Sequence, residues 1–338
     1  MLTKPDVQDV EIVESLRQAY GLKAIEIDFL PLGADPNAAV YRARMHDQAV
    51  WFVKLRRGGV DDVPMQVAHA LYAQGIREVV APLRTKTGVL STTVQDFTLT
   101  VYPFVAGRNG FEVALSPQQW AAFGRALRQV HSAVLPPELV AQIPHETYSP
   151  IWREMVAAFQ VTAAQTAFDD PIRAALASLL QAEADNINRL VAQAAHLAVN
   201  LQAHPRPSVP CHTDIHAGNL LINPDGIHIA MVDWDAPLMA PKERDLMFIG
   251  AGIGGIWNTP QESALFYQGY GETTIDPIAL AYYRCARVVE DIAVYCRDIF
   301  GTSQSADDRA EGLRQLSGQF RPGSVVEIAL ESTHSLAG

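Results

Sequence analysis

The chain has 338 residues, of which 49% are hydrophobic and 19% are charged. These proportions are typical of a globular protein and exclude a disordered one, and the length favours two lobes over a single hydrophobic core. Lysine and arginine number 26 against 37 acidic residues, a formal net charge of −11. This balance disfavours nucleic acid as a partner, because phosphate binding needs basic side chains, and it is compatible with a cationic small molecule.

Three cysteines, Cys211, Cys285 and Cys296, form neither a disulfide framework nor a CxxC metal pair, which favours free thiols in a reducing compartment. No apolar run reaches the length of a bilayer span. The acidic, amphipathic N-terminus MLTKPDVQDVEIVESL is unlike a signal peptide. We therefore expect a cytoplasmic protein with no membrane partner, and the sequence leaves the oligomeric state open.

The first hundred residues predict mostly strands after an initial helix over 5–19. The candidate strands alternate apolar and polar residues and are separated by turn residues. They are AIEIDFLPLG, AAVYRARM, AVWFVKLRR, GVLSTTVQ and FTLTVYPFV. A helix is expected over 61–75, where acidic residues open the segment and Gly75 closes it.

From Ser116 onward the pattern becomes helical. In SPQQWAAFGRALRQVHSAV a serine stands at the cap position, Pro117 follows in the first turn, and apolar residues recur at helical spacing. Further helices are expected near 151–160, 170–200, 260–271, 276–300 and 306–318. A strand-rich lobe, 1–103, therefore precedes a helical lobe, 104–338, and a cleft between lobes is a favoured ligand site.

A short β segment with polar interruptions lies among these helices, between residues 208 and 235. SVPCH, NLLIN and IHIAMV predict three strands, with Asp214 and Asn219 in the loop after the first strand and Asp233 directly after the third. Three oxygen-bearing side chains are thus expected at one edge of an apolar scaffold. Such a set suits Mg²⁺, which takes oxygen ligands and leaves room for phosphates.

The spacing also predicts a division of roles in phosphoryl transfer, which depends on alignment and on neutralising phosphate charge. We assign Asp214 as the base that accepts a hydroxyl proton, and Asn219 and Asp233 as magnesium ligands. Each residue alone fits a structural role, as a turn cap, a backbone partner or a strand end. The pattern H-x-D-x-x-x-x-N followed by D-x-D, with strands between, favours the functional interpretation.

HTDIHAGN resembles the catalytic loop of the aminoglycoside phosphotransferase family, relatives of the eukaryotic protein kinases, and VDWD stands where the kinases have their metal-binding Asp-Phe-Gly. Further stretches resemble family members that act on spectinomycin: YPF followed by NGF, LRQVH, YSP and WRE within 148–154, APKERDLMFIG, GYGE, YYR and VVEDIAVY. The resemblance covers nearly the whole chain. It implies an α+β, bilobal protein-kinase-like fold, with a small β-rich N-terminal lobe for the nucleotide and a larger helical C-terminal lobe for catalysis and the substrate.

The resemblance also implies a reaction. The enzyme would use ATP, with GTP not excluded, and Mg²⁺ to phosphorylate a hydroxyl of a cationic aminocyclitol antibiotic, spectinomycin first. Two alternatives stay open: a kinase for another small hydroxyl compound, such as an amino alcohol or a sugar, and a nucleotide-binding module without catalysis. The complete set of Lys54, Asp214, Asn219 and Asp233 argues against the second.

A kinase-like N-terminal lobe needs a cation on a strand to hold the nucleotide phosphates. Lys54, in AVWFVKLRR, has that setting, although a lysine on an exposed strand face is the ordinary alternative. Kinases pair this lysine with a helical glutamate, but here the following helix has only Asp61 and Asp62 near its start. Asp62 is a weak candidate, and helix capping explains it equally well.

The nucleotide loop should be the turn PLGADPNAAVY, which has Gly33 but lacks the kinases' G-x-G-x-x-G. Backbone amides there could still cover phosphates, whereas Asp35 is a candidate for facing the substrate. In the connector VYPFV, backbone groups at Tyr102 and Phe104 are expected to contact adenine, with Pro103 stiffening the crossing.

Four further polar residues are assigned by the resemblance. Asp245, in PKERDL, resembles the buried aspartate that braces the catalytic loop through backbone hydrogen bonds, and His212 is an orienting group. His216 stands where protein kinases have a lysine near the γ-phosphate, with a loop hydrogen bond as the equal alternative. Asp235 is a second-rank candidate for binding substrate or assisting the base.

The acceptor site is expected late in the second lobe, where a cationic aminocyclitol would need carboxylates and aromatic walls. Glu290 and Asp291, in RVVEDIAVYCRDIF, are the candidate carboxylates, although Arg287 and Asp291 also fit an ordinary i,i+4 surface pair. Trp234 and Trp257 are candidate walls, and core packing is equally plausible for both.

The glycine pattern GAGIGG at 250–255 superficially fits a dinucleotide fingerprint. No strand–helix–strand unit surrounds it, and Pro260 falls where the helix of that fingerprint should continue. A close helix approach or a wall of the substrate cleft is the better interpretation.

Overall fold

The computed structural model describes residues 4–33, 37–59, 61–301 and 304–334. The chain forms two compact units, and their segments alternate along the sequence. The first unit comprises Met1–Leu115, Ala133–Ile143 and Ala217–Pro237, and the second comprises Ser116–Ser132, Pro144–His216 and Leu238–Gly338. The lobe boundary predicted between 103 and 104 stays a prediction.

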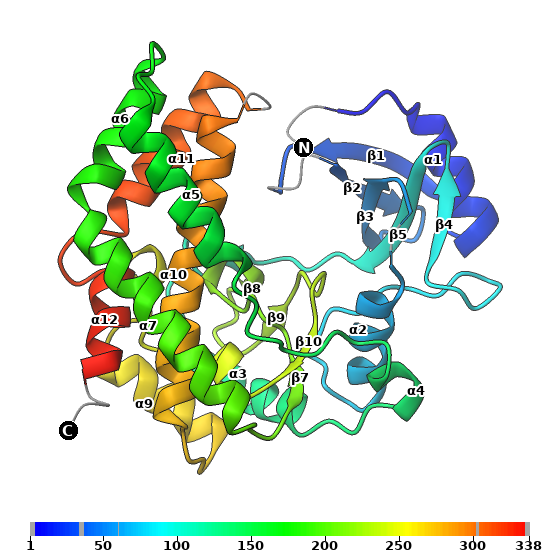
Figure 1. The fold of residues 1–338 in the computed structure, drawn as a ribbon. Coiled ribbons are helices and arrows are strands. Elements are labelled where there is room, and N and C mark those ends of the chain that lie inside the picture. The colour runs from blue at the N-terminus through cyan, green and yellow to red at the C-terminus, as the bar shows by residue number, and fades with distance from the viewer. Residues whose placement is uncertain (1–3, 34–36, 60, 302–303, 335–338) are drawn as a thin grey trace. The chain divides into compact units, whose positions relative to one another are not determined.

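The first unit is built on a five-stranded antiparallel sheet (Figure 1). Its strands are β1 Ala24–Leu30, β2 Ala38–Met45, β3 Val50–Arg57, β4 Ser91–Val94 and β5 Phe97–Pro103. They lie in the order β1-β2-β3-β5-β4, and all five strands expected from the alternation are confirmed. Apolar residues of the sheet pack with Ile12 of α1 (Asp9–Ser15) and Leu16 of the π-helical turn that follows it (Leu16–Tyr20).

A second, smaller sheet belongs to the same unit. It consists of β6 (Arg108–Asn109), β8 (Leu220–Ile222) and β9 (Ile229–Met231). The N–H of Val80 donates to the carbonyl of Met231 at 3.1 Å. This bond ties the hairpin β8–β9 to the first hundred residues. The same unit also contains the helices α2 (Val63–Ala73) and α4 (Pro137–Val140).

The second unit is mostly helical. Its helices are α3 Pro117–His131, α5 Ile151–Gln165, α6 Pro171–Ala182, α7 Ala184–Ala203, α8 Glu243–Leu246, α9 Pro260–Tyr270, α10 Pro277–Phe300, α11 Ala306–Gly318 and α12 Val325–His334. A 3₁₀ turn, Ile253–Gly255, lies within the glycine pattern, and β7 (Val209–Cys211) pairs with β10 (Leu238–Ala240). The core gathers around α10, with Val156, Leu176 and Leu190 among its fully buried partners.

Local signals explain where several helices begin. The Ser116 hydroxyl accepts the N–H of Gln119, and the Gln119 side chain accepts the N–H of Ser116, so the predicted cap of α3 is a reciprocal capping box. One difference concerns the helix expected over 170–200, which is two helices. The break falls at Glu183, with φ of −98° and ψ of 12°, and neither glycine nor proline marks it in the sequence.

A strand-rich N-terminal region followed by a helical C-terminal region confirms the α+β class. Among the helices within the described ranges, none is both long enough and apolar enough to cross a membrane.

Candidate active site

The two predicted metal ligands lie at one end of the hairpin β8–β9 in the first unit. Leu220 pairs with Met231, and just beyond this pair the N–H of Val232 donates to the carbonyl of Asn219 at 3.0 Å. Asn219 is therefore joined to the residue that directly precedes Asp233. The backbone of Asp233 is left-handed, with φ of 65°, a conformation that aspartate tolerates better than most residues.

Lys54 lies on β3 and forms ion pairs with the acids that follow β9. Its Nζ lies 2.6 Å from Asp235 Oδ2 and 3.7 Å from Asp233 Oδ1. Only 19% of the lysine side chain is exposed, so it does not lie on a solvent-facing surface. Its partners are thus Asp233 and Asp235, whereas Asp62 occupies the N-cap position of α2.

Tyr102 lies near the same acids. It stands opposite Phe52 across the β3–β5 pair, and the two rings are 6.4 Å apart in an edge-on arrangement. Burial raises the pKa of Tyr102, and the negative charges of Asp235 and Asp233 raise it further. The phenol therefore stays protonated beside these carboxylates.

The other predicted nucleotide contacts are less closely defined. Gly33 has a left-handed backbone, with φ of 95°, and open space where a Cβ would stand. The N–H of Phe104 donates to the carbonyl of Val50 at 3.3 Å, so the protein itself uses this amide. Asp35 lies outside the described residues.

In the second unit, Asp245 supports the loop that carries Asp214. The N–H of His212 donates to Asp245 Oδ2 at 2.8 Å, and that of Thr213 donates to Oδ1 at 2.7 Å. Thr213 has φ of 75°, which is a strained conformation for a β-branched residue. The two bonds to Asp245 offset this strain and fix the backbone directly before Asp214.

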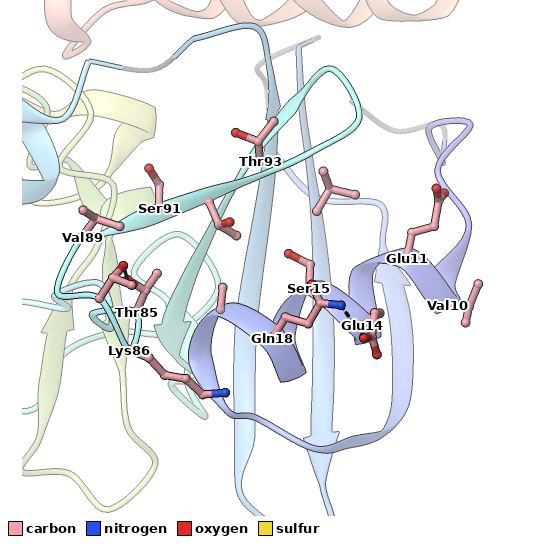
Figure 2. Close-up of a pocket in the computed structure, with 14 residues that line it drawn as sticks. Val10, Glu11, Glu14, Ser15, Gln18, Thr85, Lys86, Val89, Ser91 and Thr93 are labelled. Carbon is pink, nitrogen blue, oxygen red and sulfur yellow. Dashed lines mark hydrogen bonds between the residues drawn. The ribbon is translucent and has the colours of Figure 1, made fainter.

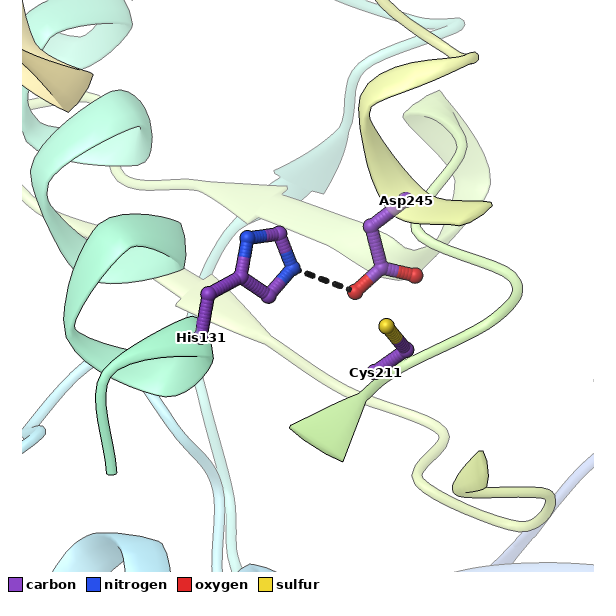
Figure 3. A group of neighbouring side chains, drawn as sticks. All are labelled: His131, Cys211 and Asp245. Atoms are coloured by element: carbon purple, nitrogen blue, oxygen red, sulfur yellow. Dashed lines mark hydrogen bonds and ion pairs between the residues drawn. The ribbon is translucent and has the colours of Figure 1, made fainter. Parts of the chain in front are cut away.

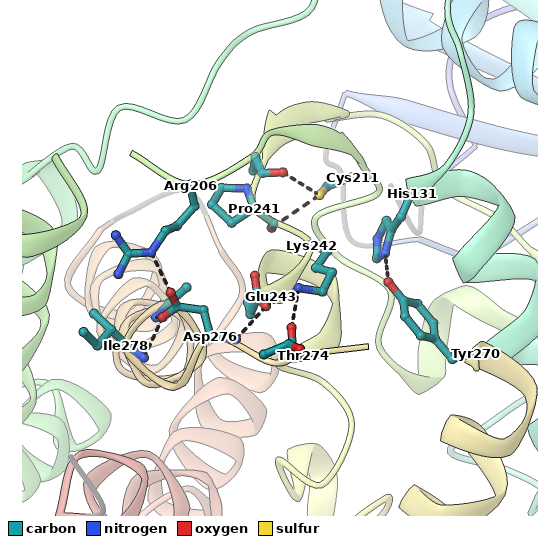
Figure 4. A network of polar contacts seen from close by, with 12 residues as sticks. His131, Arg206, Cys211, Pro241, Lys242, Glu243, Tyr270, Thr274, Asp276 and Ile278 are labelled. Atoms are coloured by element: carbon teal, nitrogen blue, oxygen red, sulfur yellow. Dashed lines mark hydrogen bonds and ion pairs between the residues drawn. The ribbon is translucent and has the colours of Figure 1, made fainter. Parts of the chain in front are cut away.

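His131 of α3 holds Asp245 in turn (Figure 3). Its Nε2 lies 3.1 Å from Asp245 Oδ2, and its Nδ1 lies 2.7 Å from the Tyr270 hydroxyl (Figure 4). All three side chains are buried. Burial by itself raises the pKa of Asp245, but the hydrogen bond and charge of His131 outweigh this effect and lower it below its usual value.

His131, Cys211 and Asp245 also place potential metal ligands within 4.8 Å of one another. A metal would need the thiolate form of cysteine, but burial raises the pKa of the Cys211 thiol well above its usual value. Its sulfur donates to the carbonyls of Ala240 and Pro241, at 3.6 and 3.7 Å. Since both nitrogens of His131 are hydrogen-bonded as well, we interpret the cluster as a structural support.

The short helix α8, which carries Asp245, also anchors the start of α10 (Figure 4). Glu243 Oε1 accepts Lys242 Nζ at 2.7 Å and the N–H of Asp276 at 3.0 Å. Asp276 caps α10 and also lies 2.6 Å from Nε of Arg206. Through α8, the support of the Asp214 loop is thus joined to the first turn of the helix that carries Arg287.

Asp214 itself contacts Arg287 of α10. The Nη1 of Arg287 lies 2.5 Å from Asp214 Oδ1, and its Nε lies 2.8 Å from Asp291 Oδ1. The Nε2 of His216 lies 3.5 Å from Asp214 Oδ2. Burial by itself raises the pKa of Asp214, but the His216 hydrogen bond and the Arg287 charge lower it well below its usual value. The carboxylate is therefore ionised at neutral pH, as a base must be.

The two candidate acceptor carboxylates have different surroundings. Asp291 is engaged by Arg287 and by the Gln319 amide, which donates to Oδ2 at 3.2 Å. Burial raises the pKa of Glu290, although the charges of Arg244 and Arg287 oppose it. Burial therefore makes the ionisation of Glu290 harder.

Both candidate tryptophan walls are 5% exposed. Trp257 packs on Trp120 and Phe123, at ring-centroid distances of 5.2 and 5.5 Å, and the indole N–H of Trp234 donates to the carbonyl of Met231 at 3.3 Å. Core packing therefore describes both side chains as they lie in the structure.

Sequence reasoning missed several of these contacts. Arg287 and Asp291 do form the expected i,i+4 pair, but both side chains are only 19% exposed, and the arginine also reaches Asp214, 73 residues away. His131 meets Asp245 across 114 residues. The only signal for this second contact was the position of His131 at the end of an apolar helical stripe, and that position does not indicate which residue the histidine contacts.

A hollow of about 780 Å³ lies on the first unit beside α1 and β4 (Figure 2). Its polar lining includes Glu11, Glu14 and Lys86. Glu14 is bonded to Arg17 and to Gln18. Among the residues that the structure describes, no predicted site residue lines the hollow, so it gives no support to the candidate site.

A lysine on a sheet strand, an acid and an amide on a hairpin, and a supported aspartate loop are the parts that a kinase-like phosphotransferase uses. The model of the phosphotransferase enzyme family, APH, matches residues 29–287, and the chain belongs to this family. The expected kinase-like fold is thereby confirmed. The protein is an enzyme that transfers a phosphoryl group to a hydroxyl acceptor.

Two solved structures of spectinomycin phosphotransferase APH(9)-Ia are similar to this chain. The complex with ADP and spectinomycin is 38% identical, with a TM-score of 0.91, and the match covers 97% of this chain and 99% of that one. The AMP complex is 37% identical, with a TM-score of 0.86 and coverages of 96% and 98%.

An aminoglycoside phosphotransferase from Alicyclobacillus acidocaldarius shares the fold at 15% identity, with a TM-score of 0.64 and coverages of 99% and 97%. A search of curated proteins found no match.

Proposed function

We propose that this phosphotransferase moves the γ-phosphoryl group of ATP to a hydroxyl of a cationic aminocyclitol, with spectinomycin as the first acceptor to test. One observation carries the choice of acceptor. At 38% identity over 97% of the chain, it is similar to a protein whose structure holds ADP and spectinomycin. The net charge of −11 is compatible with a cationic acceptor.

In this proposal Asp214 is the catalytic base. Its carboxylate accepts the proton of the acceptor hydroxyl while the oxygen attacks the γ-phosphorus and the bond to the ADP oxygen breaks. The lowered pKa of Asp214 keeps the base ionised before the acceptor binds. The bonds from His212 and Thr213 to Asp245 hold the loop in one conformation, so the base is already oriented when the acceptor binds.

Lys54, Asn219 and Asp233 serve the nucleotide in the same proposal. Lys54 would bind the phosphates, and its present partners, Asp233 and Asp235, hold its ammonium group in place. Asn219 and Asp233 offer only oxygen donors, which fits Mg²⁺ and disfavours the softer metals. When bound, Mg²⁺ would neutralise charge on the phosphate oxygens.

A panel of acceptors tests the proposal. The purified protein is incubated with ATP or GTP, Mg²⁺ and one acceptor at a time: spectinomycin, several aminoglycosides, ethanolamine, choline and simple sugars. We expect ADP release that depends on spectinomycin, and a single phosphorylated hydroxyl located by ³¹P and ¹H NMR.

Other outcomes of the panel would contradict the proposal in distinct ways. If another hydroxyl compound is consumed rapidly and spectinomycin is ignored, the chain is a kinase for a different metabolite. If the protein binds Mg-ATP tightly but phosphorylates nothing in the panel, the non-catalytic alternative is favoured.

A further inference from the structure

Arg287 links the predicted base to a second carboxylate. Its guanidinium contacts Asp214 through Nη1 and Asp291 through Nε, at 2.5 and 2.8 Å. The Gln319 amide holds the other oxygen of Asp291. The polar contacts therefore run in sequence from Gln319 through Asp291 and Arg287 to one oxygen of Asp214.

Packing keeps this arginine in place. Its Cζ lies 5.5 Å from the centroid of the Phe248 ring, and Phe248 is only 1% exposed. The ring of His216, which contacts the second oxygen of Asp214, also packs on Phe248, at 6.3 Å. Phe248 thus lies against both groups that contact the carboxylate of the base.

We propose that Arg287 is a positioning residue for the transfer reaction: its bond to Oδ1 fixes the orientation of the Asp214 carboxylate, which receives the acceptor proton. A planar fork that bonds two carboxylates at once has few alternative conformations, and this is the property that a positioning group needs. The inference rests on the role of Asp214 as base proposed above. It also means that Asp291 acts through Arg287 and is not a binding group for the acceptor.

Several charged groups of the second unit face this centre. His216 contacts Asp214 from its own loop, and α10 contributes Arg287, Asp291 and Glu290. Arg244, on α8, acts on Glu290. Arg287 is the cation that contacts Asp214 from α10, so its removal raises the pKa of the base, whereas loss of Asp291 removes a negative charge and does not.

The test compares Arg287→Met with Arg297→Met, a matched change on the same helix. Arg297 is 53% exposed and pairs with Asp298. With the acceptor found in the panel, we expect Arg287→Met to lower kcat roughly tenfold or more, from misplacement of the base, at an unchanged KM for ATP. The acid limb of the kcat/KM profile should lie at higher pH than in the wild type, and Arg297→Met should match the wild type.

Asp291→Asn separates positioning from charge. Arg287 then loses one of its two anchors but keeps its charge beside Asp214. We expect a lower kcat with the acid limb unmoved or slightly lower in pH. A general loss of packing would instead alter both variants in the same way, so equal shifts in the same direction would overturn the inference.

The melting temperature of each variant shows whether it folds. If Arg287→Met does not fold, Arg287→Lys replaces it, because lysine keeps the charge but cannot reproduce the planar fork. A reduced kcat with an unmoved acid limb in this variant supports positioning, and a wild-type kcat overturns it. Should Arg287→Met fold and behave as Arg297→Met while Asp214→Ala is inactive, the inference falls and the proposed function stands. If the wild-type protein phosphorylates nothing, both fall.

Discussion

Asp214 and Asp233 belong to different units of the chain, and they have different roles in the proposed reaction. Asp214 is surrounded by groups that keep it ionised, which suits a base. Asp233 is half exposed and lies 3.7 Å from Lys54, which suits a group that binds metal and phosphate. Substitution of Asp214 should therefore affect the transfer step, and substitution of Asp233 should also affect the binding of metal and nucleotide.

For this pair we predict that Asp214→Ala lowers kcat by roughly a hundredfold or more, the usual contribution of a positioned base, while Mg-ATP still binds. Asp233→Ala should also weaken magnesium-dependent nucleotide binding. Steady-state kinetics and calorimetric titration with a non-hydrolysable ATP analogue measure the two effects. Glu311→Ala, an exposed carboxylate on α11, is the control, and equal, mild effects of both aspartate changes would refute the assigned roles.

Asp245 gives a prediction about pH. Because its pKa is lowered in the folded protein, its ionised form contributes stability above the unfolded pKa of about 3.9, and this contribution is lost as pH falls through the folded value. We expect Asp245→Asn to be least stable relative to the wild type near pH 7, with the difference shrinking below about pH 4. Urea unfolding of both proteins from pH 3 to 7 measures it, and a difference that grows on acidification would show the opposite sign.

At the scale of elements, α3 and α9 pack with their backbones close together, and two glycines make this possible. A Cβ at Gly269 would overlap the carbonyl oxygen of Ala121, and one at Gly124 would overlap that of Phe266. Small residues at a helix crossing allow such an approach. The glycines in these helices therefore serve packing and do not mark helix ends.

We predict that Gly269→Ala lowers the free energy of unfolding by about 1–3 kcal/mol, or more, because the added methyl group forces the helices apart. Gly318→Ala is the control. It lies at the end of α11 with no heavy atom within 4 Å of the added Cβ, so it should be neutral or stabilising by up to about 1 kcal/mol. Thermal and urea unfolding compare the two, and equal effects would show that the crossing at Gly269 accommodates the added methyl group.

Elements with a strong local signal were predicted well. The strands of the five-stranded sheet follow apolar alternation, and α3 begins at the predicted cap, Ser116. The break at Glu183 was missed, because the residues on both sides keep helical spacing and no breaker intervenes. The helix α12 was missed as well. VVEIALESTH is short, and its apolar residues are recognisable as a helix face only once they are seen to pack against the core around α10.

At the scale of the whole molecule, the net charge of −11 predicts an effect of salt. A negative field raises the local concentration of a cationic acceptor, and salt screens this field. At saturating Mg-ATP we expect kcat/KM for a cationic acceptor to fall several-fold between about 0.02 and 0.3 M ionic strength, mainly through KM. Initial rates in potassium chloride measure it, and the same slope for an uncharged acceptor would exclude an electrostatic origin.

By itself the sequence determined the class of fold, the spacing of the aspartate, amide and aspartate motif, and the family, because these depend on local periodicity and on residues close together in the chain. Only the tertiary structure decided which group each charged side chain contacts. Lys54 meets Asp235 across 181 residues, and Arg287 meets Asp214 across 73. Such partners are set by how helices and strands pack, and every charged residue on an amphipathic element has several possible partners until that packing is known.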